Sequence, residues 1–192
     1  MDTQEAVKDI KLIRQMMERA SHKFLFSPWQ WIEWGILVMI GCLITDWLIR
    51  HGQLNHIIFL WIAIFIIGSA LETFIWMAAA RDQGIDAFNS FIVKLWGVAG
   101  CIMLMSIVLT FVFIDLNQIL YIPGLWLMTM GTIFLSFFLL ADRKDLLVIG
   151  AFQMVGGILA VSILLSFALY MLFIFFGIGS LTMGIYMLIK SK

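Results

Sequence analysis

The last apolar run of the chain, residues 146–189, is 44 residues long and contains no charged side chain. A single helix of that length would measure about 66 Å, whereas the hydrocarbon core of a bilayer is about 30 Å thick. The run therefore has to fold back on itself. A turn near Ser166–Tyr170 divides it into two segments of about 20 residues, each long enough to span a membrane. Such a run is not compatible with a soluble globular domain.

Four further apolar runs precede this one, at about 29–49, 57–80, 91–114 and 119–141. Together with 146–165 and 170–189 they predict six transmembrane helices, arranged as three helical hairpins within a domain spanning residues 28–192. The composition agrees, because 63% of the 192 residues are hydrophobic and only 12% are charged, with a mean hydropathy of +1.05. The predicted fold class is an all-α polytopic membrane protein, whose first partner is the lipid bilayer.

No motif in the sequence indicates catalysis, a cofactor or a metal centre. The glycine-rich nucleotide loops and the zinc or serine hydrolase motifs are missing, and 12 basic residues balance 12 acidic ones, so nucleic-acid binding is not expected. Cys42 and Cys101 lie inside apolar runs and are interpreted as packing residues. His51 and His56 share one loop near Asp46, which leaves a loop metal site as an alternative to solvated histidines.

The N-terminal segment, residues 1–27, is predicted to form a cytoplasmic amphipathic helix. Apolar residues recur at steps of three and four from Ala6 to Phe24 and draw one stripe along it. Such a helix lies at the membrane interface or against the bundle; a short coiled-coil contact with a second copy or another protein is the alternative. Ser27, Pro28 and Gln30 then form a capping-box pattern that predicts the start of the first span.

The basic residues fall almost entirely on one side of the predicted membrane. Eleven of them lie in the N-terminal segment, in the loops after the second and fourth spans, and near or in the C-terminal tail, whereas Arg50 alone lies in the opposite loops. Positively charged loops mark the cytoplasmic side. Both termini are therefore predicted to be cytoplasmic, as an even number of spans requires.

The three predicted hairpins share small-residue patterns that suggest a parallel pseudo-threefold repeat about an axis along the membrane normal. The first helix of each hairpin begins with glycines, and the second carries small residues near its centre. Small residues also serve ordinary helix packing inside one chain. The glycines and small residues concerned are Gly35, Gly41, Gly97, Gly100, Gly150, Gly156 and Gly157 in the first helices, and Gly68, Ser69, Gly131, Thr132, Gly179 and Ser180 in the second.

Three ionisable residues lie inside the predicted spans, all in the cytoplasmic half: Glu33, Glu72 and Lys94. A charged group facing lipid costs at least a few kcal/mol, so these side chains are expected to face the bundle interior or one another. Glu72 is the deepest carboxylate, and a structural ion pair with Lys94 is the expected arrangement. A proton or cation relay and a binding site for a polar ligand are the alternatives.

The chain also resembles a family of uncharacterised small bacterial integral membrane proteins. The residues that carry the resemblance are Met17-Glu18-Arg19-Ala20-Ser21, Ile122-Pro123-Gly124-Leu125-Trp126, Phe176-Gly177 and Gly184-Ile185-Tyr186-Met187. In that family the last span usually carries a histidine and a tyrosine, where this chain has Ser180 and Met183. The three-hairpin plan is more remotely similar to the HdeD-type acid-resistance membrane proteins. These resemblances imply a protein of the bacterial inner membrane and no enzymatic activity.

The sequence thus favours a non-enzymatic integral inner-membrane protein that acts as an accessory, regulatory or stress-response component. It also leaves room for a homo-oligomer or a partner in a membrane complex. The alternative is a small transporter or proton-coupled carrier that uses the intramembrane Glu72.

Overall fold

The protein is an all-α polytopic membrane protein, as the sequence predicts. The computed structural model describes residues 27–83, 90–141 and 143–190, and six stretches within them are long and apolar enough to cross a membrane. The amphipathic helix predicted for residues 1–27 lies outside the described residues, apart from its last one. The helices are α2 (Pro28–Arg50), α3 (Ile57–Gln83), α4 (Ser90–Asp115), α5 (Ile122–Ala141), α6 (Lys144–Val161), α7 (Ala168–Met171) and α8 (Gly179–Lys190).

The first span starts where the capping pattern places it. Pro28 occupies the first helical position of α2, where its missing N–H costs nothing because that donor has no partner inside a helix. The backbone N–H of Ser27 donates a 2.9 Å hydrogen bond to Oε1 of Gln30, which is the return half of a capping box. This local chemistry fixes the residue at which α2 begins.

The last hairpin turns earlier than the sequence suggests. Helix α6 ends at Val161, and the backbone N–H of Leu164 bonds the carbonyl of Leu159 at 2.9 Å. The turn therefore falls at residues 162–164 rather than at 166–170. The reason is that the two spans are unequal: the fifth has 18 residues and the sixth, Leu165–Lys190, has 26. The sixth span comprises a 3₁₀ turn, α7, the π-helical segment Leu172–Ile178 and α8.

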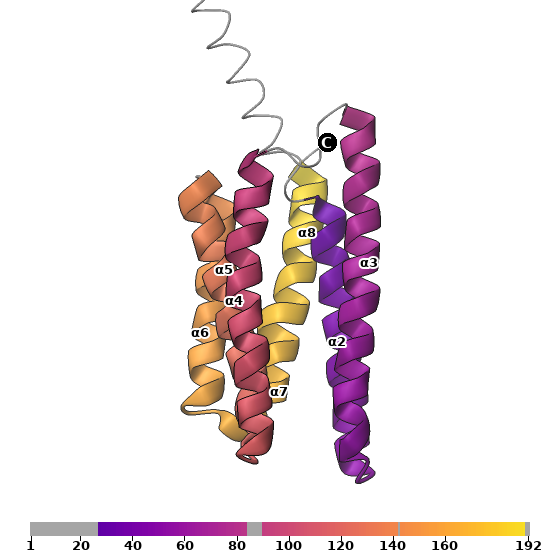
Figure 1. Ribbon diagram of the computed structural model, residues 1–192, viewed down its shortest axis with the longest axis vertical. Helices are drawn as coiled ribbons and strands as arrows, with labels where there is room; N and C mark the ends of the chain where they lie inside the picture. The colour runs from indigo at the N-terminus through magenta and orange to yellow at the C-terminus, as the bar shows by residue number, and fades with distance from the viewer. Residues whose placement is uncertain (1–26, 84–89, 142, 191–192) are drawn as a thin grey trace, which may run out of the picture.

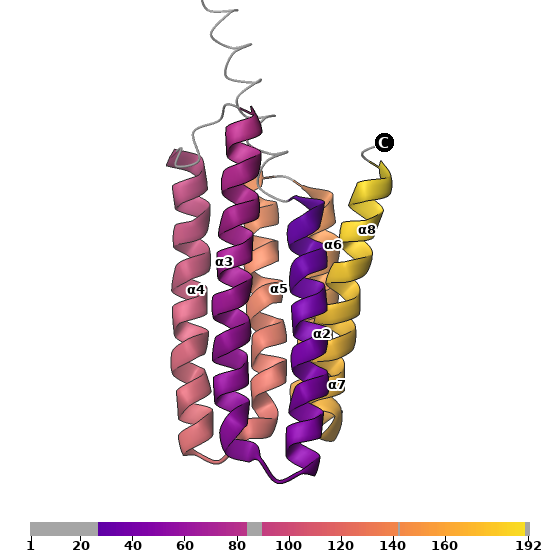
Figure 2. The ribbon, with the colours of Figure 1, turned by 90° about the vertical axis from the view of Figure 1, so that its right-hand side faces the viewer.

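The spans form one bundle. The first two hairpins, α2–α3 and α4–α5, stand apart in Figure 1, and α8 of the third hairpin is seen between them. Helix α3 packs on α2, α4 packs on α5, and α5 packs extensively on α6, while α2 packs against α8. Figure 2 shows the start of α2 and the end of α8 at the same end of the bundle. Helices α3 and α4 are the least buried spans, so they form the outer layer.

Glycines set the closest helix contacts in the bundle. A Cβ atom on Gly35 of α2 would lie 2.8 Å from the backbone nitrogen of Leu181, and one on Gly131 of α5 would lie 2.9 Å from the carbonyl oxygen of Gly150. Contacts this short leave no room for any side chain. Small residues therefore serve intrachain packing at α2–α8 and α5–α6, which is the use that membrane helices commonly make of them.

Two of the loops that join the spans close with the same geometry. Gly52 (φ +70°) and Asn117 (φ +58°) are left-handed, and each is followed by a one-turn 3₁₀ helix, Leu54–His56 in one loop and Ile119–Tyr121 in the other. Each residue of the second loop stands 65 positions after its counterpart. In the third loop the corresponding residue is Ile163, whose branched side chain disfavours a left-handed backbone.

The third loop keeps the remaining features without the left-handed residue. It also ends in a one-turn 3₁₀ helix, Leu165–Phe167, and its backbone bond from Leu164 to the carbonyl of Leu159 matches the bond from Gln53 to Leu48 in the first loop. The loop closes instead with Ser162 at φ −109° and ψ −73°.

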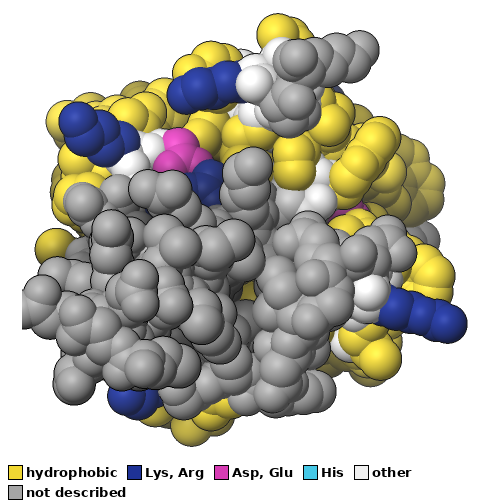
Figure 3. Space-filling model, turned by 90° about the horizontal axis from the view of Figure 1, so that it is seen from above, with side chains coloured by type: hydrophobic (Ala, Val, Ile, Leu, Met, Phe, Trp, Pro, Cys, Tyr) yellow, Lys and Arg dark blue, Asp and Glu magenta, His cyan; other side chains and the backbone are white. Residues whose placement is uncertain are grey.

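The end of the bundle that holds the start of α2 also holds most of the described basic residues. They stand at the ends of α3 and α8 and at the starts of α4 and α6: Arg81, Lys190, Lys94, Arg143 and Lys144. Figure 3, which views this end, shows basic side chains around its rim. At the opposite end Arg50 is paired with Asp46 at 2.8 Å.

Candidate functional site

The strongest candidate site lies between α2 and α3, where Trp34 and Glu72 meet. The indole nitrogen Nε1 of Trp34 donates a 3.0 Å hydrogen bond to Oε2 of Glu72. Gly68, one helical turn before Glu72 on α3, leaves the space that the ring occupies, because a Cβ there would lie 2.7 Å from Cη2 of Trp34. A glycine on one helix thus positions the donor for a carboxylate on the same helix.

Glu33 is the neighbour of Trp34 and brings a second carboxyl group to the same place. Both of its carboxyl oxygens are buried and have no hydrogen-bond partner among the described residues. Its carboxyl group is also close enough to that of Glu72 for the two charges to repel each other. The site therefore combines two carboxyl groups with one neutral donor, an arrangement that suits a positively charged ligand.

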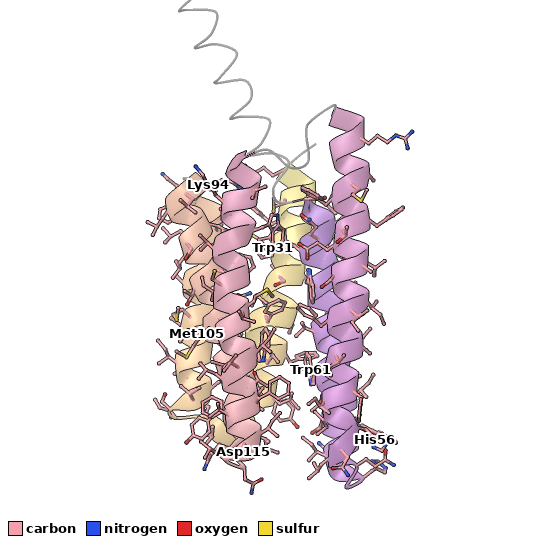
Figure 4. The ribbon with its side chains drawn as sticks, viewed as in Figure 1. Trp31, His56, Trp61, Lys94, Met105 and Asp115 are labelled. Atoms are coloured by element: carbon pink, nitrogen blue, oxygen red, sulfur yellow. The ribbon has the colours of Figure 1, made fainter. Side chains whose placement is uncertain are left out.

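The predicted ion pair between Glu72 and Lys94 is not formed. The ion pairs within 4 Å in the described part of the chain are Arg50–Asp46 and Arg143–Asp145, whereas Lys94 is exposed near the start of α4. Figure 4 shows Lys94 near the N-terminal end of α4. The prediction assumed that the second and third spans, α3 and α4, pack on each other, but α3 packs mainly on α2 and α4 on α5. Of the three predicted residues, the structure brings Glu33 and Glu72 together and leaves Lys94 apart.

A groove runs along the α2–α3 pair beside Glu33. Its volume is about 460 Å³, and its walls are largely apolar and aromatic, with Glu33 as the one acidic residue among them. Trp29 and Phe74 on its sides are 58% and 72% exposed, so the groove opens on the outside of the bundle. Its lining residues are Ser27, Trp29, Ile32, Glu33, Phe74, Ile75 and Ala78.

The space between the two outer hairpins is filled by aromatic side chains. Trp31 lies 4.8 Å from Phe134, centroid to centroid, and packs in a cluster with Leu95 of α4, against which Trp76 of α3 also packs. Figure 4 shows Trp31 and Trp61 between the helices. The gap seen between the ribbons is therefore not a channel at the level of these side chains.

Two tryptophans hold the helices of their hairpins together. Trp61 donates a 3.1 Å hydrogen bond to Oγ1 of Thr45, and Trp126 donates a 3.2 Å bond to Oγ1 of Thr110. Each ties the second helix of a hairpin to the first. Trp47, by contrast, is half exposed and stacks on a histidine of the adjoining loop, as an interfacial tryptophan does.

Gln153 and Ser180 form a second polar feature, of which the sequence analysis names only Ser180. Gln153 of α6 and Ser180 of α8 are 0% and 1% exposed, and their side-chain polar atoms have no partner in the described part of the chain. The two lie on neighbouring helices at a similar level, because Phe152 contacts the position of Gly179. A buried amide without partners is costly.

The π-helical segment explains why the hydroxyl of Ser180 stays unpartnered. The other buried hydroxyls, those of Thr45, Ser106 and Thr129, each donate to the carbonyl four residues earlier. For Ser180 that carbonyl belongs to a residue inside the segment Leu172–Ile178, where the wider winding of a π-helix changes the backbone geometry. Segments of this kind are frequent at functional sites.

No metal site emerges from the described residues, in which no three His, Cys, Asp or Glu side chains are grouped for coordination. The ring nitrogen Nδ1 of His51 lies 2.8 Å from the carbonyl oxygen of Trp47, and Asp46 is engaged with Arg50 and Tyr170. Two of the residues considered for a loop metal site, His51 and Asp46, thus have other partners.

Comparison with family models, with curated proteins and with solved structures gives no match to this chain. The fold and the site therefore define the class of protein by themselves. It is a six-span, all-α membrane protein with a pair of carboxyl groups between its first two spans.

Proposed function

We propose that this protein is a non-enzymatic component of the bacterial inner membrane, acting as an accessory or regulatory protein that binds a cationic group at Glu33 and Glu72. One observation carries the proposal. The carboxyl groups of Glu33 and Glu72 lie close enough for their charges to interact; among the described residues the neutral indole of Trp34 donates to Glu72, and Glu33 has no hydrogen-bond partner. Charges inside a membrane mark functional sites more often than structural ones, because they are expensive to bury.

The surroundings of the carboxyl pair favour binding over catalysis. Trp34 can hold Glu72 in position, and apolar groups surround Glu33 in the groove. The buried hydroxyls of Thr45, Ser106 and Thr129 donate to backbone carbonyls, so none of them is placed as a nucleophile beside a base. The site offers charge and orientation, which suffice to bind a ligand.

The location and the orientation belong to the same proposal. The eleven-to-one distribution of basic residues supports cytoplasmic termini, and the start of α2 and the end of α8 lie at one end of the bundle. The resemblance to small bacterial membrane proteins supports the inner membrane. A stress-response role and assembly with a partner or a second copy are part of this reading.

We also propose that the three hairpins are related as an internal repeat. The left-handed residues Gly52 and Asn117, the 3₁₀ turns that follow them, and the tryptophan–threonine bonds of the first two hairpins all recur at a spacing of 65 residues. The third hairpin retains the 3₁₀ turn and one backbone bond of the loop. This agreement supports a repeat that has diverged most in the third hairpin.

A carrier that uses Glu72 is the second candidate function. It is favoured by the absence of an ion pair between Glu72 and Lys94, since a carboxyl group that is not neutralised by a fixed cation can take up and release a proton or a cation. The filled space between the hairpins, around Trp31 and Trp76, favours the binding role instead.

The test is cation binding by the full chain in lipid nanodiscs, with methylammonium as the probe and calorimetry as the readout. We expect saturable binding that Glu33→Gln and Glu72→Gln each weaken by about tenfold or more. The control is Asp115→Asn, an exposed carboxyl at the opposite end of the bundle. Uptake of the probe into proteoliposomes would favour the carrier, and binding that is unchanged in both glutamate variants would refute the site.

A further inference from the structure

We propose that the ligand of this site is an amphiphilic cation, with one positively charged head group and one apolar tail, that enters sideways from the bilayer through the α2–α3 groove. The inference rests on the proposed function, because it assigns a chemical class to the ligand of the same carboxyl pair. It adds a route and a shape that the carboxyl groups alone do not require.

The groove opens toward the outside of the bundle. Trp29 lies on α2 and Phe74 on α3, and both side chains are more than half exposed on the outside of the bundle. In a protein that spans a membrane, this outer surface faces lipid at the depth of Phe74, which precedes the end of α3 by two and a half helical turns. A ligand dissolved in the bilayer can therefore reach the groove without crossing the bundle.

The walls of the groove suit the apolar tail of an amphiphile. Ile32, Ile75 and Ala78 line the groove beside the two aromatic residues, so nearly all of the surface that a ligand would contact is apolar. A volume of about 460 Å³ lies within the range of small-molecule sites. A small hydrophilic cation would leave most of this apolar surface unused, whereas an alkyl chain would cover it.

The groove carries one acidic side chain that can bind a positively charged head group. Glu33 is its acidic residue, and no described cation lies within ion-pair distance of it. The carboxyl oxygens of Glu33 are covered in the present conformation, so a change of its side-chain rotamer has to turn them toward a bound head group. Trp29 adds an aromatic face, which attracts a cation through the ring quadrupole. Glu72 does not line the groove, but its carboxyl group is close enough to interact with the charge of Glu33.

Arg81 limits the kind of amphiphile that fits. It stands three residues after Ala78 on α3 and is exposed, nearer than Glu33 to the end of the bundle at which α2 starts. The order of charges along the groove is therefore basic at the rim and acidic inside. A phospholipid has its charges in the same order, with the amine outermost and the phosphate closer to the tails, so its amine would meet Arg81 and its phosphate would meet Glu33. A simple alkylammonium compound, with its charge at one end, meets Glu33 without placing a phosphate beside it.

The experiment compares three probes on the full chain in nanodiscs: decylammonium, methylammonium and decyl sulfate. We expect decylammonium to bind at least about tenfold more tightly than methylammonium, and decyl sulfate, which has the same tail with a negative head, to show only the non-specific partitioning seen with empty nanodiscs. Glu33→Gln should weaken decylammonium binding by about tenfold or more, while Asp115→Asn leaves it unchanged.

A groove-filling variant separates this inference from the function on which it rests. Ala78→Phe places a large side chain in the groove away from the carboxyl groups, and we expect it to weaken decylammonium binding while methylammonium binding persists. If the two cations bind equally and Ala78→Phe has no effect, the lateral route is wrong and the carboxyl site stands. If neither cation binds, both proposals fall. Each variant is first checked for an unchanged unfolding temperature in the absence of probe, with Ala78→Leu as the smaller replacement if Ala78→Phe lowers it.

Discussion

Gly68 lies directly under the indole ring of Trp34, with its missing Cβ position 2.7 Å from Cη2 of that ring. The same ring donates to Glu72, so one glycine on α3 makes room for the donor of a carboxylate one turn later. The position of Trp34 thus depends on the absence of a side chain. This dependence gives the site a direct test.

Gly68→Ala should displace the Trp34 ring, because a methyl group at 2.7 Å overlaps it. We expect a loss of about 1–3 kcal/mol in the free energy of unfolding, from overpacking and from a weakened bond to Glu72. The matched control is Gly97→Ala on α4, where a Cβ would meet nothing within 4 Å. There the gain in helix propensity should raise stability slightly. Unfolding in detergent, followed by circular dichroism, measures both, and equal effects of the two variants would contradict the packing argument.

A double-mutant cycle should show that Glu72 is coupled to Trp34 and not to Lys94. Trp34→Phe keeps an aromatic ring but removes the donor, and Glu72→Gln removes the charge that it serves. Because the two atoms are in direct contact, we expect a coupling energy of about 0.5–3 kcal/mol between these changes. The cycle of Glu72→Gln with Lys94→Gln should be additive within about 0.5 kcal/mol. A larger coupling there would restore the ion pair that the sequence suggested.

The sequence is sufficient to predict six spans, because these follow from the length of the apolar runs. It is also sufficient at Ser27 and Pro28, where capping chemistry is local. It fails for the partner of Glu72. Electrostatics makes Lys94 the natural choice, but which helices touch is decided by packing across the whole bundle. No pattern within a single span reveals that α3 packs mainly on α2.

The roles of Trp34 and Gly68 were within reach of the sequence only in part. The sequence indicates Gly68 as one of the small residues near the centre of the second span, but it does not single out Trp34. Their separation of 34 residues across a hairpin carries no periodic signal. Trp34 and Gly68 lie at similar levels on antiparallel spans, which is compatible with contact. Predicting the contact also requires the direction in which each residue faces around its helix.

The matched loops predict that Asn can replace Gly at the first turn. Gly52 has φ +70° with no atoms near its missing Cβ, so a substitution there meets backbone strain rather than a clash. Gly52→Val should cost about 1–2 kcal/mol, because a branched residue rarely adopts a left-handed backbone. Gly52→Asn should cost clearly less, since Asn117 holds the same conformation in the second loop. Chemical unfolding of the two variants measures the difference, and an equal cost would argue against equivalent loops.

The orientation can be tested with reporter fusions, one after Lys192 and one within residues 51–56. The basic residues place the first in the cytoplasm and the second on the opposite side. We expect a cytoplasm-active reporter to work only at the C-terminus and a reporter active outside the cytoplasm to work only in the loop. Activity of both fusions in one compartment would contradict the five spans that lie between the two fusion sites.

Replacing the buried amide of Gln153 should raise the free energy of unfolding rather than lower it. Its side chain is 0% exposed and both of its polar atoms lack a partner in the described part of the chain, so it is a cost to the folded state. Gln153→Met, which keeps the length of the side chain, should therefore raise the free energy of unfolding by about 1–3 kcal/mol. Ser180→Ala should act in the same direction by a smaller amount.

The control for this prediction is Ser106→Ala. The hydroxyl of Ser106 lies 2.5 Å from that of Thr129 and also bonds a backbone carbonyl. Removing a partnered hydroxyl should lower stability by about 1 kcal/mol. The two positions should thus shift the unfolding temperature in opposite directions. A loss of stability on Gln153→Met would mean that the amide does have a polar partner in the membrane, and the level of Gln153 and Ser180 would then be a second binding site beside the π-helical segment.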